Sequence, residues 1–245
     1  MKYLRKTLYK LLGIKLYLRL ISNLYLKMIN LGFFKNQHAE IHYLKSIIKP
    51  GDICIDIGAN LGYYSYFMAK YCGIHGKVYA VEPVNLFTKI LKKNTSKFRN
   101  IIIYPYALGE ENCVVKMAMP FIDGVLHHGM TKISKTENSE KVIYFDVEMC
   151  VPEKLFSDLE RLDFLKIDVE GYENIVLTNM KNILQKFHPL IQCELSGELN
   201  RHNSLNFLQL LGYKPFILKN KELLPISSEE ITIWEKDFYF IYKQI

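Results

Sequence analysis

The sequence predicts an α/β fold with a doubly wound, mostly parallel sheet. Short apolar runs that fit buried strands alternate with longer stretches that contain no helix breaker. Strands are expected at residues 53–57, 77–81 and 101–104, with helices at 63–71 and 85–98 between them. This repeated succession of strand and helix is typical of a parallel sheet that carries helices on its faces.

Length and composition fit one domain with additions. The chain has 245 residues, of which 49% are hydrophobic, so it can bury a sizeable core. It contains five cysteines and no C-x-x-C pair, which indicates reduced thiols in a cytoplasmic protein rather than a disulfide framework or a zinc site. We therefore expect a main domain at residues 50–245 and a helical extension at residues 1–49.

Positive charge is concentrated in the first 35 residues. The chain has a net charge of +7, and this segment holds eight lysines and arginines and no acid, which leaves −1 for residues 36–245. The charge thus gives no reason to expect a nucleic-acid partner. The longest uncharged run, residues 20–26, is too short to span a membrane, which takes about 20 apolar residues. Two interpretations stay open: an amphipathic helix at the inner face of an anionic membrane, or a helix packed on the domain with a basic outer face.

The first strand leads into a turn that predicts a ligand site. Asp56 stands at the strand end, and Gly58 and Gly62 open the turn into the next helix. A carboxylate there would repel a pyrophosphate bound at the helix N-terminus. The two glycines are also spaced G-x-x-x-G and not as the dinucleotide motif G-x-G-x-x-G. The corner therefore favours a cationic ligand.

The second strand ends in another acid, Glu82. An acid at this place accepts hydrogen bonds from ribose hydroxyls. A ligand that is cationic and carries a ribose is S-adenosyl-L-methionine rather than NAD. We expect Asp56 and Glu82 to face a shared cavity, since both stand at strand ends of one sheet edge.

An insertion hairpin is predicted at about residues 112–147. Two strands without an intervening helix, at 114–119 and 141–147, flank a polar loop at 123–140. Loops of this length are usually functional or disordered. The loop contains His127 and His128, which are either candidates for a general base or solvated loop side chains.

Two acids follow the fourth strand, residues 164–167, ahead of a helix expected at 173–187. These acids, Asp168 and Glu170, are costly at a sheet edge unless they bind something. The alternative is that Glu170 caps the helix and Asp168 accepts from backbone amides. With acids at three strand ends, we favour a role in function.

The predicted role of Asp168 or Glu170 is to orient or deprotonate an acceptor hydroxyl. Glu194, at the end of the fifth strand, is a third candidate for this role. The same three carboxylates could instead hold Mg²⁺, so the use of a metal stays open.

Several motifs together resemble the FkbM family of S-adenosylmethionine-dependent methyltransferases. They read D-I-G-A-N-L-G at 56–62, V-E-P at 81–83 and L-K-I-D-V-E-G-Y-E at 165–173, and the resemblance extends over about residues 50–215. It implies the seven-stranded class I methyltransferase sheet, Rossmann-like with its last strand antiparallel. It also implies methylation of oxygen atoms on sugars, polyketides or other small molecules.

By position, the resemblance assigns the cofactor-binding residues. Those for the methionyl part would be Asp56, Gly58, Asn60 and Gly62. Glu82 would take the ribose hydroxyls, and Ala107 would lie near the adenine.

We therefore predict an O-methyltransferase that acts on a sugar, a glycan precursor or another small molecule. One rival is a glycosyltransferase that uses Asp168-Val169-Glu170 as a D-x-D-like metal site. Another is a non-catalytic binding module that residues 1–35 recruit to a membrane.

Overall fold

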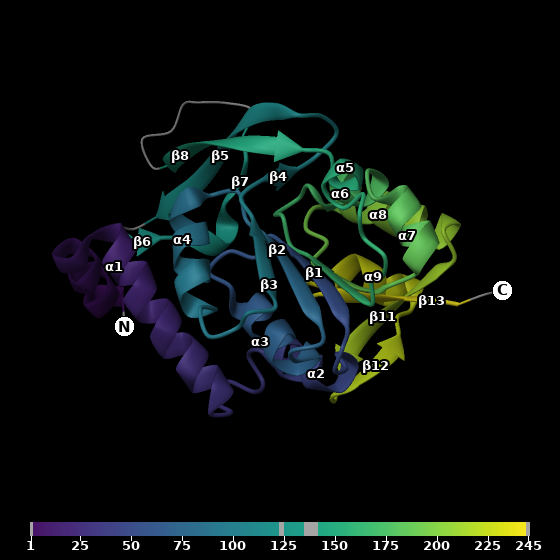
Figure 1. Ribbon diagram of the computed structural model, residues 1–245, viewed down its shortest axis with the longest axis horizontal. Coiled ribbons are helices and arrows are strands. Elements are labelled where there is room, and N and C mark those ends of the chain that lie inside the picture. The colour runs from purple at the N-terminus through teal and green to yellow at the C-terminus, as the bar shows by residue number, and fades with distance from the viewer. Residues whose placement is uncertain (1, 123–124, 135–141, 244–245) are drawn as a thin grey trace.

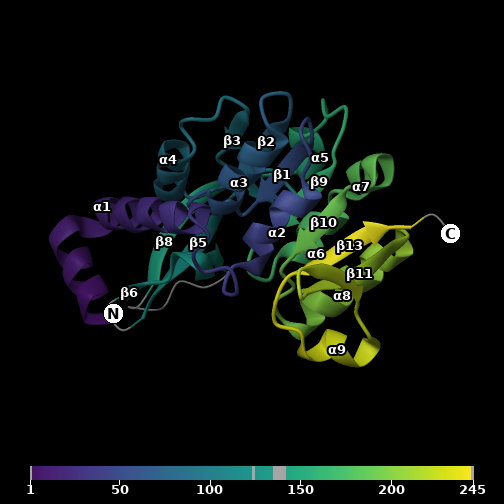
Figure 2. The same cartoon turned by 90° about the horizontal axis from the view of Figure 1, so that it is seen from below.

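The computed structural model describes residues 2–122, 125–134 and 142–243. Its main sheet has the strand order β12-β11-β13-β10-β9-β1-β2-β3 (Figures 1 and 2). The bounds are β1 Ile53–Ile57, β2 Lys77–Val81, β3 Ile101–Tyr104, β9 Phe164–Ile167, β10 Leu190–Cys193, β11 Tyr213–Lys219, β12 Glu222–Pro225 and β13 Phe238–Tyr242. From β10 to β3 all neighbours pair in parallel, whereas β13 lies antiparallel between β10 and β11.

The main sheet has eight strands, so the predicted number of seven was wrong by one. The additional strand, β12, pairs antiparallel with β11 through a two-residue turn at Asn220 and Lys221. Both turn residues have positive φ, 52° and 66°, which is the geometry of the tight hairpin turn that matches strand twist.

Helices pack on both faces of the main sheet because apolar side chains of its central strands alternate in direction. Cys54 and Val78 are buried against helices α2 (Ala39–Ile47) and α3 (Tyr63–Cys72). On the same face, Ala80 contacts Leu91 of α4 (Asn85–Asn94). Ile55 faces the other way, into the core that holds the later helices. These are α5 Pro152–Leu155, α6 Glu173–Thr178, α7 Lys181–Phe187 and α8 Glu198–Leu210; α9 spans Ser228–Ile233.

Two helices differ from the predicted spans. The helix expected at 173–187 is split into α6 and α7, and the amide of Asn179 at the break donates to the carbonyl of Ile175 at 2.9 Å. Helix α4 ends at Asn94 rather than at residue 98, and Thr95 Oγ1 donates to the carbonyl of Leu91. In both cases a polar side chain bonds the backbone of the preceding turn, as such residues often do where a helix stops.

A second, smaller sheet lies at the top of Figure 1, above β1 to β3. Its centre is the antiparallel pair β5 (Cys113–Ile122) and β8 (Val142–Cys150). The short strand β4 (Ala107–Leu108) pairs in parallel with the end of β8. Between β5 and β8 lie β6 Val125–Leu126, the 3₁₀ turn His128–Met130 and β7 Lys132–Ile133. Residues 123–124 and 135–140 of the predicted loop, and residue 141 of the predicted second strand, lie outside the described residues.

Helix α1 (Lys2–Asn30) runs beside α4 and is bent at Gly13, whose φ is 67° (Figure 2). Its Tyr17 and Leu18 are buried against Phe87 and Ile90 of α4. In the part of the chain that the structure describes, no helix is both long and apolar enough to cross a membrane.

Candidate active site

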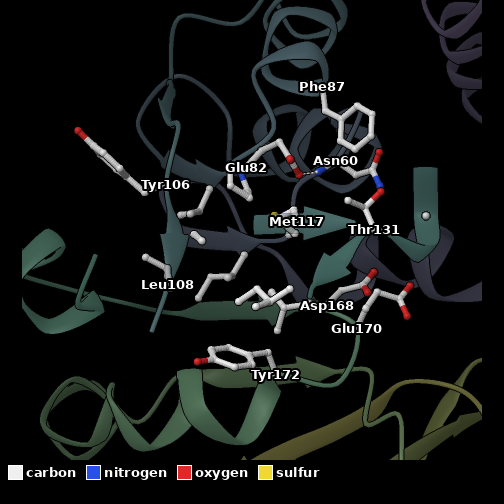
Figure 3. Close-up of a pocket in the computed structure, with 18 residues that line it drawn as sticks. Asn60, Glu82, Phe87, Tyr106, Leu108, Met117, Thr131, Asp168, Glu170 and Tyr172 are labelled. Atoms are coloured by element: carbon white, nitrogen blue, oxygen red, sulfur yellow. Dashed lines mark hydrogen bonds between the residues drawn. The ribbon is translucent and has the colours of Figure 1, made fainter. Parts of the chain in front are cut away.

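A pocket lies at the carboxyl ends of β1, β2 and β9, next to the small sheet (Figure 3). Counted out to its opening, and with the open space at its mouth included, it measures about 680 Å³. The main-sheet residues that line it include Gly58, Asn60, Glu82, Asp168 and Glu170. From the small sheet and its surroundings come Tyr106, Ala107, Leu108, Met117, Thr131 and Ile133.

The turn after β1 approaches the end of β9 closely. Gly58 has a φ of 81°, and a Cβ atom built on it would lie 1.8 Å from the carbonyl oxygen of Asp168. Only glycine fits this approach. Asn60, two residues later, is also left-handed, with a φ of 49°. A left-handed backbone conformation at a residue other than glycine costs about 1–3 kcal/mol, and such residues cluster at functional sites.

Glu82 is the buried acid of the pocket, with an exposed fraction of 4%. Its Oε2 accepts from the backbone N–H of Asn60 and its Oε1 from that of Val84, each at 2.8 Å. Burial raises the pKa of Glu82 to about 7. Each carboxylate oxygen can accept a further hydrogen bond. Glu82 can therefore receive two hydroxyl groups of a ligand without losing its contacts to the turn.

Asp56 does not line the pocket, contrary to the expectation that it shares a cavity with Glu82. It lies within β1, where side chains alternate, and it points to the face that α3 covers. There its Oδ2 accepts from Ser65 Oγ at 2.5 Å. Burial raises the pKa of Asp56, and its Oδ1 has no hydrogen-bond partner among the described residues. Gly62 is likewise not in the lining; it precedes α3 and packs on Leu91.

A buried lysine, which sequence reasoning missed, lies next to Asp56. Lys166 of β9 is in register with Asp56 of β1 and Gln192 of β10, and it is only 2% exposed. Its Nζ donates to Asp168 Oδ2 at 2.9 Å and lies 4.4 Å from the ring centre of Tyr64. Burial acts to lower the pKa of Lys166, but the nearby aspartates outweigh it and raise this pKa above the ordinary value of lysine.

The predicted carboxylates Asp168, Glu170 and Glu194 are neighbours. Burial, followed by the charge of Asp168, raises the pKa of Glu170 to about 7 and that of Glu194 to about 8. Asp168 and Glu170 line the pocket, whereas Glu194 does not. Across residues 2–122, 125–134 and 142–243, no group of three His, Cys, Asp or Glu side chains is arranged to hold a metal ion.

Backbone hydrogen bonds to Glu173 hold the turn that carries Glu170. Glu170 has a left-handed φ of 54°. The fully buried Glu173 accepts from the backbone N–H of Val169 at 3.1 Å and of Gly171 at 3.0 Å. These bonds hold the backbone on both sides of Glu170 and so fix where its side chain starts.

His128 fastens the insertion to the glycine turn. Its carbonyl accepts from Asn60 Nδ2, and its Nδ1 lies 3.0 Å from Asn60 Oδ1. Neither His127 nor His128 lines the pocket, although Gly129 and Thr131 beside them do. The structure thus places His128 at the edge of the site, where it positions the loop.

The two ends of the pocket differ in chemistry (Figure 3). Tyr106 and Leu108 lie at one end and Asp168 and Glu170 at the other, with Tyr172 along the lower side. Tyr106 directly precedes Ala107 in the segment 105–109, which follows the third strand and was expected to lie at the adenine corner. The arrangement can hold an apolar ring system at one end and a cation at the other.

A family model and a solved structure are similar to this chain. A family model described as the methyltransferase FkbM domain matches residues 56–215. Among solved structures, the methyltransferase FkbM from Methylobacillus flagellatus KT is similar, with 15% identity and a TM-score of 0.51. The similarity covers 96% of this chain and 57% of that one, so the chain spans somewhat more than half the length of that structure.

Two further structures are similar at lower TM-scores. An S-adenosylmethionine-dependent O-methyltransferase from Thermotoga maritima has 14% identity and a TM-score of 0.46 over 85% of this chain and 66% of that one. Aeropyrum pernix fibrillarin, with natively bound S-adenosyl-L-methionine, has 14% identity and a TM-score of 0.45 over 80% of this chain and 68% of that one. No curated protein matches the sequence.

Proposed function

Because the chain belongs to the FkbM family of methyltransferases, we propose that it transfers the methyl group of S-adenosyl-L-methionine to a hydroxyl oxygen. The acceptor we propose is a sugar, a glycan precursor or another small molecule. The observation that carries the proposal is that one pocket combines three features. It has an apolar end, it contains Glu82 in the position expected to bind ribose hydroxyls, and the acids Asp168 and Glu170 lie in its wall.

S-adenosyl-L-methionine is the cofactor that the family and the site both support. Gly58 lets the turn after β1 lie against the backbone of Asp168 at the pocket wall, and Glu82 offers its oxygens to hydroxyls. The raised pKa values of Glu82 and Glu170 reflect burial together with mutual repulsion among acids. A cation in the pocket relieves this repulsion, so the site fits a sulfonium better than a phosphate.

The cofactor supplies a methyl group bound to positively charged sulfur, which is a good leaving group. The chain must align the acceptor hydroxyl with that carbon, which can contribute roughly 7–11 kcal/mol. A general base must also remove the proton of the hydroxyl, which typically raises the rate by about 10²–10⁴-fold. We assign the base to Glu170, because it lines the pocket and its pKa of about 7 suits proton transfer at neutral pH.

Asp168 is better suited to orient the hydroxyl than to deprotonate it. Its Oδ2 already accepts a hydrogen bond from the ammonium group of Lys166 at 2.9 Å, which fixes the direction of the carboxylate. Glu194 stays outside the lining and has a raised pKa of about 8, and we propose that its ionisation above this pH acts on its neighbours Asp168 and Glu170 without any contact with the acceptor.

The two rivals explain less of the site. A D-x-D metal site would need Asp168 free for a metal, yet one of its oxygens is bound to Lys166. A non-catalytic module recruited to a membrane would not account for the acids Asp168 and Glu170 in the pocket wall.

Calorimetry with S-adenosylhomocysteine and with a nucleotide diphosphate sugar tests the proposal. We expect binding of the first and not of the second. Glu82→Gln should weaken binding at least tenfold, since one buried oxygen acceptor is lost, whereas the exposed control Glu222→Gln should bind as wild type. Binding of the nucleotide sugar alone would overturn the proposal.

The roles of the acids are tested by separating binding from turnover. Asp168→Asn and Glu170→Gln should retain affinity for S-adenosylhomocysteine. Neither variant should convert S-adenosylmethionine to S-adenosylhomocysteine when it is assayed with a panel of sugar acceptors. Wild-type turnover in either variant would remove that residue from the mechanism.

A further inference from the structure

Helix α1 is apolar on two sides, and only one of them is used for packing. Tyr17 and Leu18 are buried against the domain. Leu16, Leu20 and Leu24 are spaced four residues apart and thus form one row along the helix, with exposed fractions of 54%, 51% and 58%. A helix that only covers a core has a polar outer face. The exposed leucine row therefore calls for a second partner.

The leucine row borders a groove between α1 and α4. The groove contains four cationic side chains: Arg19 and Lys27 from α1, with Lys93 and Lys97 from the end of α4 and the residues after it. Among the described residues that line the groove there is no acid. The charge here is thus of one sign, and it adjoins the exposed apolar row.

The groove is a fixed part of the fold. Asn94 Nδ2 donates to Ser22 Oγ at 3.0 Å and to the carbonyl of Leu61 at 2.8 Å, and both Ser22 and Asn94 are buried. These bonds connect α1 to α4 and to the turn before α3. The cations of the two helices are therefore held side by side.

We propose that the surface formed by Leu16, Leu20, Leu24, Arg19, Lys27 and Lys93 docks the protein on an anionic membrane surface. The cationic side chains would bind lipid phosphate groups in the groove. The leucine row would insert at the boundary between the lipid headgroups and the acyl chains. This combination of basic and apolar side chains on one helix is how interfacial helices bind anionic lipid. The inference does not depend on the methyl-transfer reaction.

Vesicle sedimentation tests the docking surface with the full chain. We expect binding to phosphatidylcholine vesicles that contain about one-third phosphatidylglycerol, and much weaker binding to pure phosphatidylcholine. A basic residue near such a surface typically contributes about fivefold to partitioning, so Arg19→Gln, Lys27→Gln and Lys93→Gln combined should lower it by about a hundredfold. Leu20→Ser with Leu24→Ser should remove the binding that persists at about 1 M salt, where charges are screened within about 3 Å.

A matched control replaces three exposed lysines away from the groove, Lys154, Lys181 and Lys214, by glutamine. It should bind anionic vesicles as wild type. Thermal unfolding and affinity for S-adenosylhomocysteine should be unchanged in the groove variants, because none of these residues lines the cofactor pocket.

Three results would overturn the proposal. The first is an equal loss of binding in the control and the groove variants. The second is binding of soluble glycerol phosphate without any binding to vesicles. The third is self-association in sedimentation velocity that the leucine substitutions abolish, which would assign the row to a second copy of the chain.

Discussion

Replacing Lys166 by methionine should leave a cluster of buried acids without its cation. Lys166 is 2% exposed and lies next to Asp56, Asp168 and Asp237. Methionine has a similar shape and keeps the packing against the ring of Tyr64. The substitution therefore changes mainly the charge.

The magnitude follows from the contact with Asp168. Two unit charges 2.9 Å apart attract by about 6 kcal/mol at an effective dielectric constant of about 20. Desolvation of the lysine offsets part of this, and removal of one partner of a buried pair typically costs about 3–5 kcal/mol. Asp168 is 31% exposed and can regain water, so we expect a loss of about 3 kcal/mol in the free energy of unfolding at pH 8.

The loss should shrink in acid. Burial raises the pKa of Asp56 and of Asp237, and Lys166 opposes this, so the variant should have still higher values. A folded-state pKa above the unfolded one means that the native state binds more protons, and stability falls as pH rises through that pKa. The difference between variant and wild type should therefore be larger at pH 8 than at pH 5.

Urea unfolding at the two pH values measures this, with the exposed Lys214→Met as the control. The control should differ from wild type by less than about 0.5 kcal/mol at both. A cost of Lys166→Met that is below about 1 kcal/mol, or equal at both pH values, would refute the role given to this lysine.

Three further predictions concern the pocket. Gly58→Ala should lower the melting temperature and abolish binding of S-adenosylhomocysteine, because its Cβ would meet the carbonyl of Asp168; wild-type affinity in calorimetry would contradict this. Turnover should rise with pH through about 7 as Glu170 loses its proton, and Glu170→Gln should flatten the profile and cost about 10²–10⁴-fold; a variant with an unchanged profile would exclude Glu170 as the base. Asn60→Ala should release the turn at His128, seen as faster hydrogen exchange at residues 126–133 and weaker cofactor binding; equal exchange would show that these bonds do not hold the turn.

Much of the main sheet could be predicted because its signal is local. The strands at 53–57, 77–81 and 101–104 are short apolar runs bounded by turn residues, and each lies where the pattern placed it. Three of the predicted acids line the pocket because they follow parallel strands whose carboxyl ends lie at the same edge of the sheet. These acids are Glu82, Asp168 and Glu170.

What the sequence did not reveal depends on pairing between distant segments. Lys166 looks like a polar interruption of an apolar strand, and only the register with Asp56 and Gln192 shows that it is buried. The prediction for Asp56 was wrong because it considered only that this residue lies near the end of a strand. Successive side chains along a strand point to opposite faces of the sheet, so a difference of one position decides which face a side chain lies on. The contact of Asn60 with His128 joins positions 68 residues apart.

Two residues, Ala107 and Leu108, belong both to the pocket wall and to the small sheet, through the pairing of β4 with β8. The hairpin cannot tilt without carrying with it the wall beside which the nucleoside base would lie. Substitutions far out along β5 and β8 should therefore alter affinity for the nucleoside even though they never touch it. A hairpin of another length joined at this seam should therefore change the affinity for the nucleoside along with the shape of the neighbouring pocket wall.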